Sequence, residues 1–249
     1  MDIDVFPNVV DFMGPNGMAF TRRPQIRYTP MSGASSFAIA LENPGADLDE
    51  ALGDVSPDNK YPDLTAQFRT SGDWGHAQVA GLLRYLGFDT PGAAGANPKD
   101  NQTGWGINLT SNFKFKKSDR LILAVVYGNG IASYMNDGGT DLAPDGPPGN
   151  LDAQAVPLVG IVAYYDHTWD DLWTSSIGYS RTEVTNTDFQ AADAFNYGEY
   201  ASANVLYAPQ KNILTGAEFL YGTRHDKNGD NGEDYRLQVT MKYSFSSKD

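Results

Sequence analysis

The chain has 249 residues, of which 41% are apolar and 12% aromatic, and this composition excludes an intrinsically disordered protein. Its formal net charge of −13 excludes nucleic-acid binding, because phosphates require a basic protein surface. It has no cysteine, which excludes a disulfide framework and thiolate metal sites.

Residues 1–6, at the start of the chain, have neither the basic region nor the apolar core of a signal peptide. We therefore expect the chain to be mature, truncated or not exported. No run of about eighteen apolar residues follows, so an ordinary transmembrane helix is not expected. The mean hydropathy of −0.42 still permits a membrane barrel, because its strands are apolar only at alternate positions.

Segments in which apolar and polar residues alternate follow one another along the chain. Side chains alternate between the two faces of a strand, so each segment has one apolar and one polar face. The predicted strands cover residues 18–29, 35–43, 63–72, 74–88, 103–115, 119–135, 156–169, 171–186, 197–210, 213–226 and 234–245. Most reach the roughly 9–11 residues that cross a bilayer. The pattern predicts an all-β fold, a transmembrane antiparallel β-barrel with about eleven strands in this chain.

The connectors between the predicted strands alternate strictly in length. The short ones are residues 30–34, 72–73, 116–118, 170–171 and 209–212, and the long ones are 44–62, 89–102, 136–155, 187–196 and 227–233. Short turns on one side and long loops on the other are typical of outer-membrane barrels. The long loops are acidic, so we interpret the net charge as mainly a property of exterior loops.

Aromatic residues collect where predicted strands meet short turns, and this distribution indicates an interfacial girdle on that side of a membrane. These residues are Tyr28, Phe113, Phe115, Trp169, Trp173, Tyr207 and Phe245. Buried aromatics of a soluble β-sandwich are the alternative interpretation.

If the apolar face of each strand meets lipid, Phe20 and Ile26 face outward and the opposite face lines a lumen. We predict four pore-lining, anion-binding arginines, which are Arg23, Arg27, Arg69 and Arg84. Further candidate pore-lining residues are Arg22, Gln25, Gln67, Gln78, Glu42 and Glu218. Arg22 has the wrong parity unless a bulge intervenes.

Rings of arginine favour anions in pores, because guanidinium groups bind carboxylates in a bidentate manner. The four arginines are therefore interpreted as an anion-selective ladder. An alternative stays open, in which they pair with lumen carboxylates and only brace the barrel. The expected carboxylates are Glu42, Asp166 and Glu218.

Residues that could carry catalysis or bind a metal are scarce. Of the three histidines, His225 beside Asp226 is the best candidate for a catalytic pair, and adjacent residues on a strand point to opposite faces. Residues 226–234 resemble a calcium loop in composition but lack its register, so we expect a solvated hairpin loop. No catalytic residue, metal site or cofactor is predicted, and the chain is not expected to be an enzyme.

Residues 4–29 resemble a segment of the DcaP-like outer-membrane porins, chiefly through the Phe6-Pro7-Asn8 and Gly14-Pro15-Asn16-Gly17 pieces. Residues 216–224 and the closing strand are similar to the end of the same family. The resemblance implies a trimer of barrels with about sixteen strands each, passing small anions that include dicarboxylates. It also implies a periplasmic N-terminal helical extension, which the residues of this chain do not contain.

Counting strand directions back from the closing strand places residues 1–17 on the loop side, as an extracellular or constriction-type segment. Residues 18–245 then form barrel strands and residues 246–249 a short tail. Bacterial barrels normally have an even strand number, so an odd number of strands should precede Met1. We therefore expect the C-terminal portion of a larger barrel.

The predicted function is passive diffusion of small hydrophilic solutes through the bacterial outer membrane, with a bias toward anions such as dicarboxylates. The alternatives are a structural or adhesive outer-membrane barrel whose acidic loops bind a partner, and a soluble β-sandwich binding module. The expected partners are the lipid bilayer with lipopolysaccharide, small anionic solutes, and further copies of the chain in a full-length homotrimer. No nucleic acid is expected.

Overall fold

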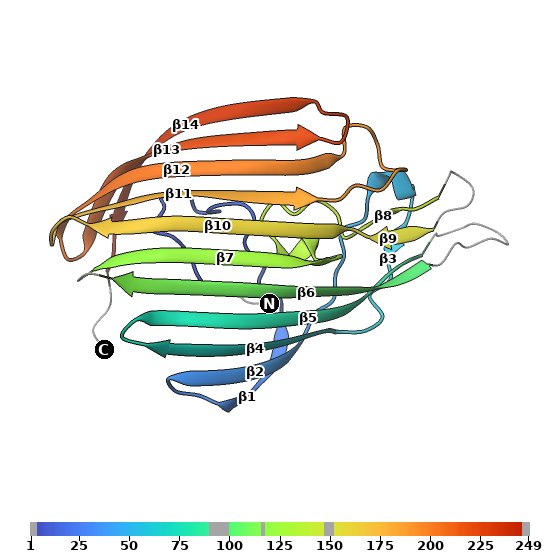
Figure 1. Cartoon of the computed structure of the whole chain (residues 1–249), viewed down its shortest axis with the longest axis horizontal. Helices are drawn as coiled ribbons and strands as arrows, with labels where there is room; N and C mark the ends of the chain where they lie inside the picture. Colours follow the sequence, from blue (N-terminus) through green and yellow to red (C-terminus); the bar gives the residue numbers. More distant parts are fainter. Residues whose placement is uncertain (1–3, 90–99, 116–117, 147–151, 246–249) are drawn as a thin grey trace.

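The computed structural model describes residues 4–89, 100–115, 118–146 and 152–245 as one antiparallel sheet with shorter segments packed against it (Figure 1). The strands along the sheet, in order, are β1 (Gln25–Met31), β2 (Ser35–Glu42), β4 (Asp63–Gly72), β5 (Gly75–Asp89), β6 (Asp100–Phe115), β7 (Asp119–Asn129), β10 (Pro157–Thr168), β11 (Trp173–Val184), β12 (Phe195–Gln210), β13 (Ile213–Asp226) and β14 (Asn231–Tyr243). Each strand pairs with its neighbour in sequence among these. The predicted all-β fold is confirmed, and the two-sheet sandwich is wrong.

The remaining elements lie in the long loops. The first long loop, residues 43–62, contains the 3₁₀ helix η1 (Glu50–Leu52) and β3 (Ser56–Pro57), which pairs with β5. The third long loop, residues 130–156, contains η2 (Ala132–Tyr134) and the hairpin of β8 (Leu142–Pro144) and β9 (Ala153–Ala155). No helix among the described residues is long and apolar enough to span a membrane.

Three predicted boundaries were wrong. The first strand begins at Gln25 instead of residue 18, and β7 ends at Asn129 instead of residue 135. In both places the chain leaves the sheet and packs against its inner face. The predicted long connector 227–233 is only the turn 227–230, because β14 begins at Asn231 instead of residue 234, while β13 ends at Asp226 as predicted. The alternation of connector lengths is therefore not strict.

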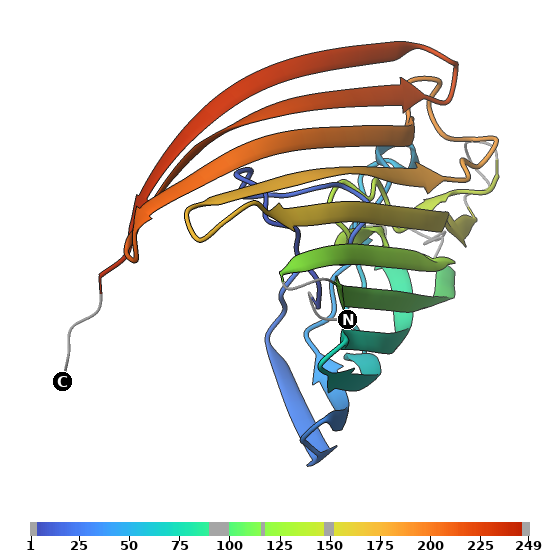
Figure 2. The same cartoon turned by 60° about the vertical axis from the view of Figure 1, so that its left-hand side comes forward.

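The sheet curves into an open trough, with β1 and β14 at its two unpaired edges (Figure 2). Its convex face carries apolar side chains that lie side by side across neighbouring strands. Ile26 pairs with Leu41, for example, and both are largely exposed, at 80% and 47%. The aromatic residues of the predicted girdle are all exposed except Tyr207, which is half-buried. A broad exposed apolar face of this kind is what lipid contact requires.

The concave face, which we call the inner face, carries three apolar clusters. The N-terminal residues and the first and third long loops, which together we call the inner segments, cover these clusters. Ile122 and Val126 of β7 and Leu158 of β10 lie on this face and are at most 1% exposed. They pack against residues 4–20 and against the third long loop. The third cluster joins Leu86 of β5 to the first and third long loops. The hydrophobic effect thus holds the loops inside the trough.

Residues 4–24 form the N-terminal inner segment, which runs along the inner face before β1 begins. Phe20 belongs to this segment and packs against Phe6, with ring centroids 6.4 Å apart, so the prediction that it faces lipid was wrong. Gly17 has φ 72° and lies directly on the backbone of Gly160 in β10. A Cβ on either glycine would collide with a carbonyl oxygen, so glycine permits this close approach.

Candidate functional site

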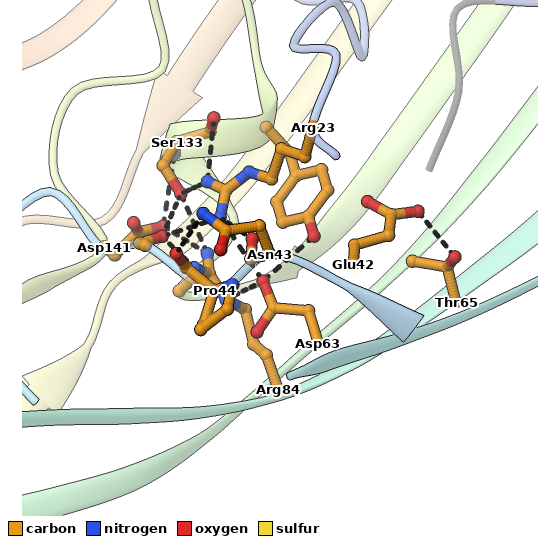
Figure 3. Close-up of polar contacts among 12 residues, drawn as sticks. Arg23, Glu42, Asn43, Pro44, Asp63, Thr65, Arg84, Ser133 and Asp141 are labelled. Atoms are coloured by element: carbon orange, nitrogen blue, oxygen red, sulfur yellow. Dashed lines mark hydrogen bonds and ion pairs between the residues drawn. The ribbon is translucent and has the colours of Figure 1, made fainter. Parts of the chain in front are cut away.

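Two arginines and two aspartates meet where the first and third long loops fold onto the inner face (Figure 3). Arg84 of β5 lies 3.1 Å from Asp141 of the third long loop and 3.3 Å from Asp63 of β4. Arg23 of the N-terminal inner segment lies 3.4 Å from Asp63. The side chains of Arg84, Asp63 and Asp141 are at most 1% exposed. Buried charges of opposite sign stabilise one another only while all partners stay in place.

Both arginines also bind the same loop atoms. The Ser133 hydroxyl accepts hydrogen bonds from Arg23 at 2.8 Å and from Arg84 at 2.9 Å. The carbonyl oxygen of Gly45 accepts from both guanidinium groups as well. Arg23 and Arg84 thereby hold the first and third long loops against the inner face of the sheet, which we call the wall. Two of the four predicted ladder arginines are therefore part of a bracing cluster.

Tyr134 of η2 completes this cluster. It is fully buried, and its hydroxyl donates a hydrogen bond to Asp63 Oδ2 at 2.9 Å. Its ring lies under the Arg23 guanidinium, with 4.2 Å between that group and the ring centroid. Burial, reinforced by the negative charge of Asp63, raises the pKa of the Tyr134 hydroxyl well above its usual range. The hydroxyl therefore remains a hydrogen-bond donor.

Arg69 of β4 binds Asp4 of the N-terminal inner segment. The Arg69 Nε to Asp4 Oδ1 distance is 3.1 Å, and the other carboxylate oxygen lies 2.9 Å from His76 Nε2. Thr110 of β6 donates a further hydrogen bond to Asp4. The Arg69 side chain remains 35% exposed, whereas that of Asp4 is 6% exposed. Arg69 thus anchors the segment and still meets water.

Glu218 of β13 holds the middle of the N-terminal inner segment without a cation. Its carboxylate accepts the backbone N–H groups of Val10 and Asp11, both at 3.0 Å. It also accepts the side-chain amides of Asn204 and Gln238, both at 2.9 Å. Glu218 is 1% exposed and forms no ion pair with any described lysine or arginine. Four neutral donors therefore compensate one buried charge.

The other predicted pore-lining residues lie on the inner face of the same wall. Gln25 and Arg27 of β1 pair with Glu42 and Ala40 of β2, which are buried on this face. The hydroxyl of Thr65 donates to Glu42 at 2.6 Å. Gln67 of β4 pairs with Ala80 of β5 and is partly exposed, while Gln78 of β5 is 6% exposed.

Arg22 lies outside any strand, because β1 begins only at Gln25. The parity argument against Arg22 therefore does not apply. The side chain is exposed and lines a cavity of about 850 Å³ between the N-terminal inner segment and the wall. Lys242 of β14 lines the same cavity and was not predicted as a pore residue.

The expected carboxylate partners of the arginines were wrong for Asp166 and Glu218. Asp166 pairs with Arg120, at 2.6 Å, and Glu218 binds the neutral donors described above. The ladder arginines Arg23, Arg69 and Arg84 pair instead with Asp4, Asp63 and Asp141. Asp141 belongs to a connector that the sequence placed outside, so part of the loop acid lies inside the trough.

The histidines form no arrangement suited to catalysis. His76 binds Asp4, His167 lies 2.9 Å from Asp119, and His225 stacks on Tyr197. Asp226, the sequence neighbour of His225, pairs with Arg224. Within the described ranges, no group of three or more His, Cys, Asp or Glu side chains could hold a metal ion.

The curved antiparallel sheet, its exposed apolar convex face and its polar inner face filled by loops have the architecture of an outer-membrane channel. A family model described as the porin subfamily matches residues 4–249. The chain belongs to this porin family. As a porin it is a channel protein of the bacterial outer membrane, where it contacts lipid and passes small solutes, and it is not an enzyme.

A solved structure supports the same fold. The porin is similar to the outer membrane channel DcaP of Acinetobacter baumannii, with a TM-score of 0.84 and 23% sequence identity. The match covers 96% of this chain and 67% of that chain. Among curated proteins no match to the chain is found. The resemblance to DcaP-like porins, predicted from residues 4–29 and 216–224, is confirmed.

Sequence reasoning missed Asp4, Asp141 and Tyr134 as the residues that position the inner segments. A signal for them was present in β7 and β10, whose sequences Leu121-Ile-Leu-Ala-Val-Val126 and Leu158-Val-Gly-Ile-Val162 are apolar on both faces. A strand that is apolar on both faces is covered on both faces. The inner covering had to come from other parts of the chain.

Proposed function

We propose that the porin passes small hydrophilic solutes by passive diffusion with a bias toward anions, dicarboxylates among them. The observation that supports this proposal is the placement of Arg27 and Arg69 on the inner face of β1 and β4. Arg27 is exposed, and Arg69 keeps 35% of its side chain exposed. Arg23 and Arg84 belong to the same ladder but act by holding the loops that narrow the pore.

The physical basis of the bias is electrostatic. A guanidinium that borders water attracts an anion at longer range than a neutral side chain does. It can also bind a carboxylate through two parallel hydrogen bonds. Transport requires this binding to be weak enough for release, which the water-exposed position of Arg27 and Arg69 favours.

Reversal potentials of the full-length porin in planar bilayers, under a KCl gradient, test the proposal. The wild type should prefer chloride, and Arg27→Gln combined with Arg69→Gln should shift the potential toward cation selectivity. Arg181→Gln is the matched control, because Arg181 of β11 lies toward the convex face and pairs with Glu183 and Glu199. A cation-selective wild type would reject the anion bias. An unchanged potential in the double variant would reject the role of the two arginines.

We further propose that the full-length porin assembles as a homotrimer in a membrane that contains lipopolysaccharide. The support is the resemblance to DcaP-like porins together with the wide apolar convex face. Mass measurement of the detergent-solubilised full-length protein tests it, and a monomeric mass at all detergent concentrations would contradict it.

A further inference from the structure

The cavity of about 850 Å³ beside Arg22 combines positive charge with apolar surface. It lies between the N-terminal inner segment and the inner face of β12–β14. Phe6, Phe12 and Phe20 line it from the segment, and Leu206 and Leu214 line it from the wall. Phe12 is 86% exposed although it belongs to a segment inside the trough. An apolar ring held in contact with water offers a surface to a passing apolar group.

The charges in this cavity are unbalanced. Arg22 and Lys242 are both exposed, and neither forms an ion pair with any residue in the described part of the chain. The acid that lines the cavity, Asp11, is already paired with Arg236 at 2.7 Å. Arg23, next in sequence to Arg22, is by contrast only 10% exposed and binds Asp63. The cavity therefore presents two cations that are available to a solute.

We propose that Arg22 and Lys242, with the phenylalanines of the N-terminal inner segment, select organic anions that carry an apolar body, such as aromatic carboxylates. This inference rests on the proposed anion-biased diffusion and names the class of anion. The carboxylate of such a solute meets Arg22 or Lys242, while its apolar body lies against Phe12 or Phe20. Small hydrophilic anions use the cations alone and gain nothing from the rings.

The probes are benzoate and acetate, which share a carboxylate and differ in the apolar body. Permeability ratios are measured from reversal potentials of the full-length porin in planar bilayers, with a benzoate or an acetate gradient. The wild type should pass benzoate in preference to acetate after correction for free diffusion. Arg22→Gln with Lys242→Gln should lower the permeability of both anions relative to potassium, by roughly threefold or more.

Phe12→Ser separates the two parts of the proposal, because it removes the exposed ring and leaves every charge in place. It should lower the permeability of benzoate and leave that of acetate unchanged. Arg22→Gln alone, at an exposed position outside the sheet, serves if the double variant does not fold. Arg181→Gln should change neither ratio.

The outcomes distinguish this inference from the proposed function. If wild-type selectivity for chloride over potassium is absent, the proposed anion bias fails and this inference fails with it. If that selectivity is present but the benzoate-to-acetate ratio is unaffected by Phe12→Ser, the inference alone is overturned. An unchanged permeability of both anions in the Arg22 variants likewise overturns it.

Discussion

The carboxylate of Glu218 accepts a hydrogen bond from the backbone N–H of Val10 at 3.0 Å, joining β13 to the N-terminal inner segment. Its second oxygen accepts the N–H of Asp11, also at 3.0 Å. Each oxygen further accepts one side-chain amide. Glu218 thus fixes Val10 and Asp11 near the middle of the wall, beside the ion pair between Asp11 and Arg236, and a change at Glu218 should alter the width of the pore.

Glu218→Gln should release this part of the segment. The amide keeps one acceptor oxygen and places an NH₂ group against two N–H donors, one from the backbone and one from a side chain. Loss of hydrogen bonds to a charged acceptor costs about 1.5–3 kcal/mol each, so the docked position should become a minor state. We expect a higher and noisier single-channel conductance of the full-length porin.

Glu199→Gln is the matched control for this experiment, because Glu199 of β12 is directed toward Tyr179 and Arg181 and away from the segment. It should leave the conductance unchanged. A Glu218→Gln channel with wild-type conductance and noise would show that Glu218 does not hold the segment.

Arg84→Met should destabilise the folded porin more than Asp141→Asn does. Removal of Arg84 leaves the Asp63 and Asp141 carboxylates buried together, with only Arg23 nearby. Breaking a buried pair from one side typically costs about 3–5 kcal/mol. Asp141→Asn leaves Arg84 paired with Asp63, so its cost should be smaller. Unfolding of both variants in guanidinium chloride, followed by tryptophan fluorescence, measures the order, and the reverse order would contradict the role given to Arg84.

The strands of this porin could be predicted from the sequence because each membrane-facing residue alternates with an inner one. Phe37, Ile39 and Leu41 of β2, for example, all lie on the convex face as the alternation indicated. The alternation carries no information about a segment that leaves the sheet. Arg23 and Phe20 were therefore assigned to a strand face, although both belong to the N-terminal inner segment, where Arg23 contacts Ser133 of the third long loop and Phe20 contacts Phe6.

The candidate site was predictable only in part for the same reason. Arg69 and Arg84 lie in regular strands, so the alternation assigns each a face of the sheet, and their role as anion-binding residues of the pore stays a prediction. Their partners, Asp4 and Asp141, come from 65 and 57 residues away along the chain and from irregular segments. Pairing over such distances depends on how the loops fold inward, and loop sequence constrains that path weakly. The alternation within strands could therefore indicate the arginines, but it could not indicate the aspartates that neutralise their charge.

Gly160→Ala should displace the N-terminal inner segment from the wall. A Cβ at Gly160 would collide with the Gly17 carbonyl oxygen, a backbone atom that cannot move without moving the segment. Overpacking of this kind costs about 1–3 kcal/mol. Gly81→Ala is the control, because the nearest atom to its Cβ would be 3.9 Å away. Limited proteolysis of the folded porin should cleave residues 4–24 faster in Gly160→Ala alone, and equal cleavage in both variants would contradict the prediction.

Tyr134→Phe removes one hydroxyl from the cluster and keeps the ring that lies under Arg23. The lost hydrogen bond to Asp63 should lower the free energy of unfolding by about 1.5–3 kcal/mol at neutral pH. Because the pKa of Tyr134 is raised in the folded state, its stabilising contribution is complete below the unfolded-state pKa of about 10 and declines at higher pH. The stability difference between wild type and Tyr134→Phe should therefore shrink above that pH. Chemical denaturation across the alkaline range measures it, with Tyr127→Phe on the convex face as control, and a constant difference would contradict this account.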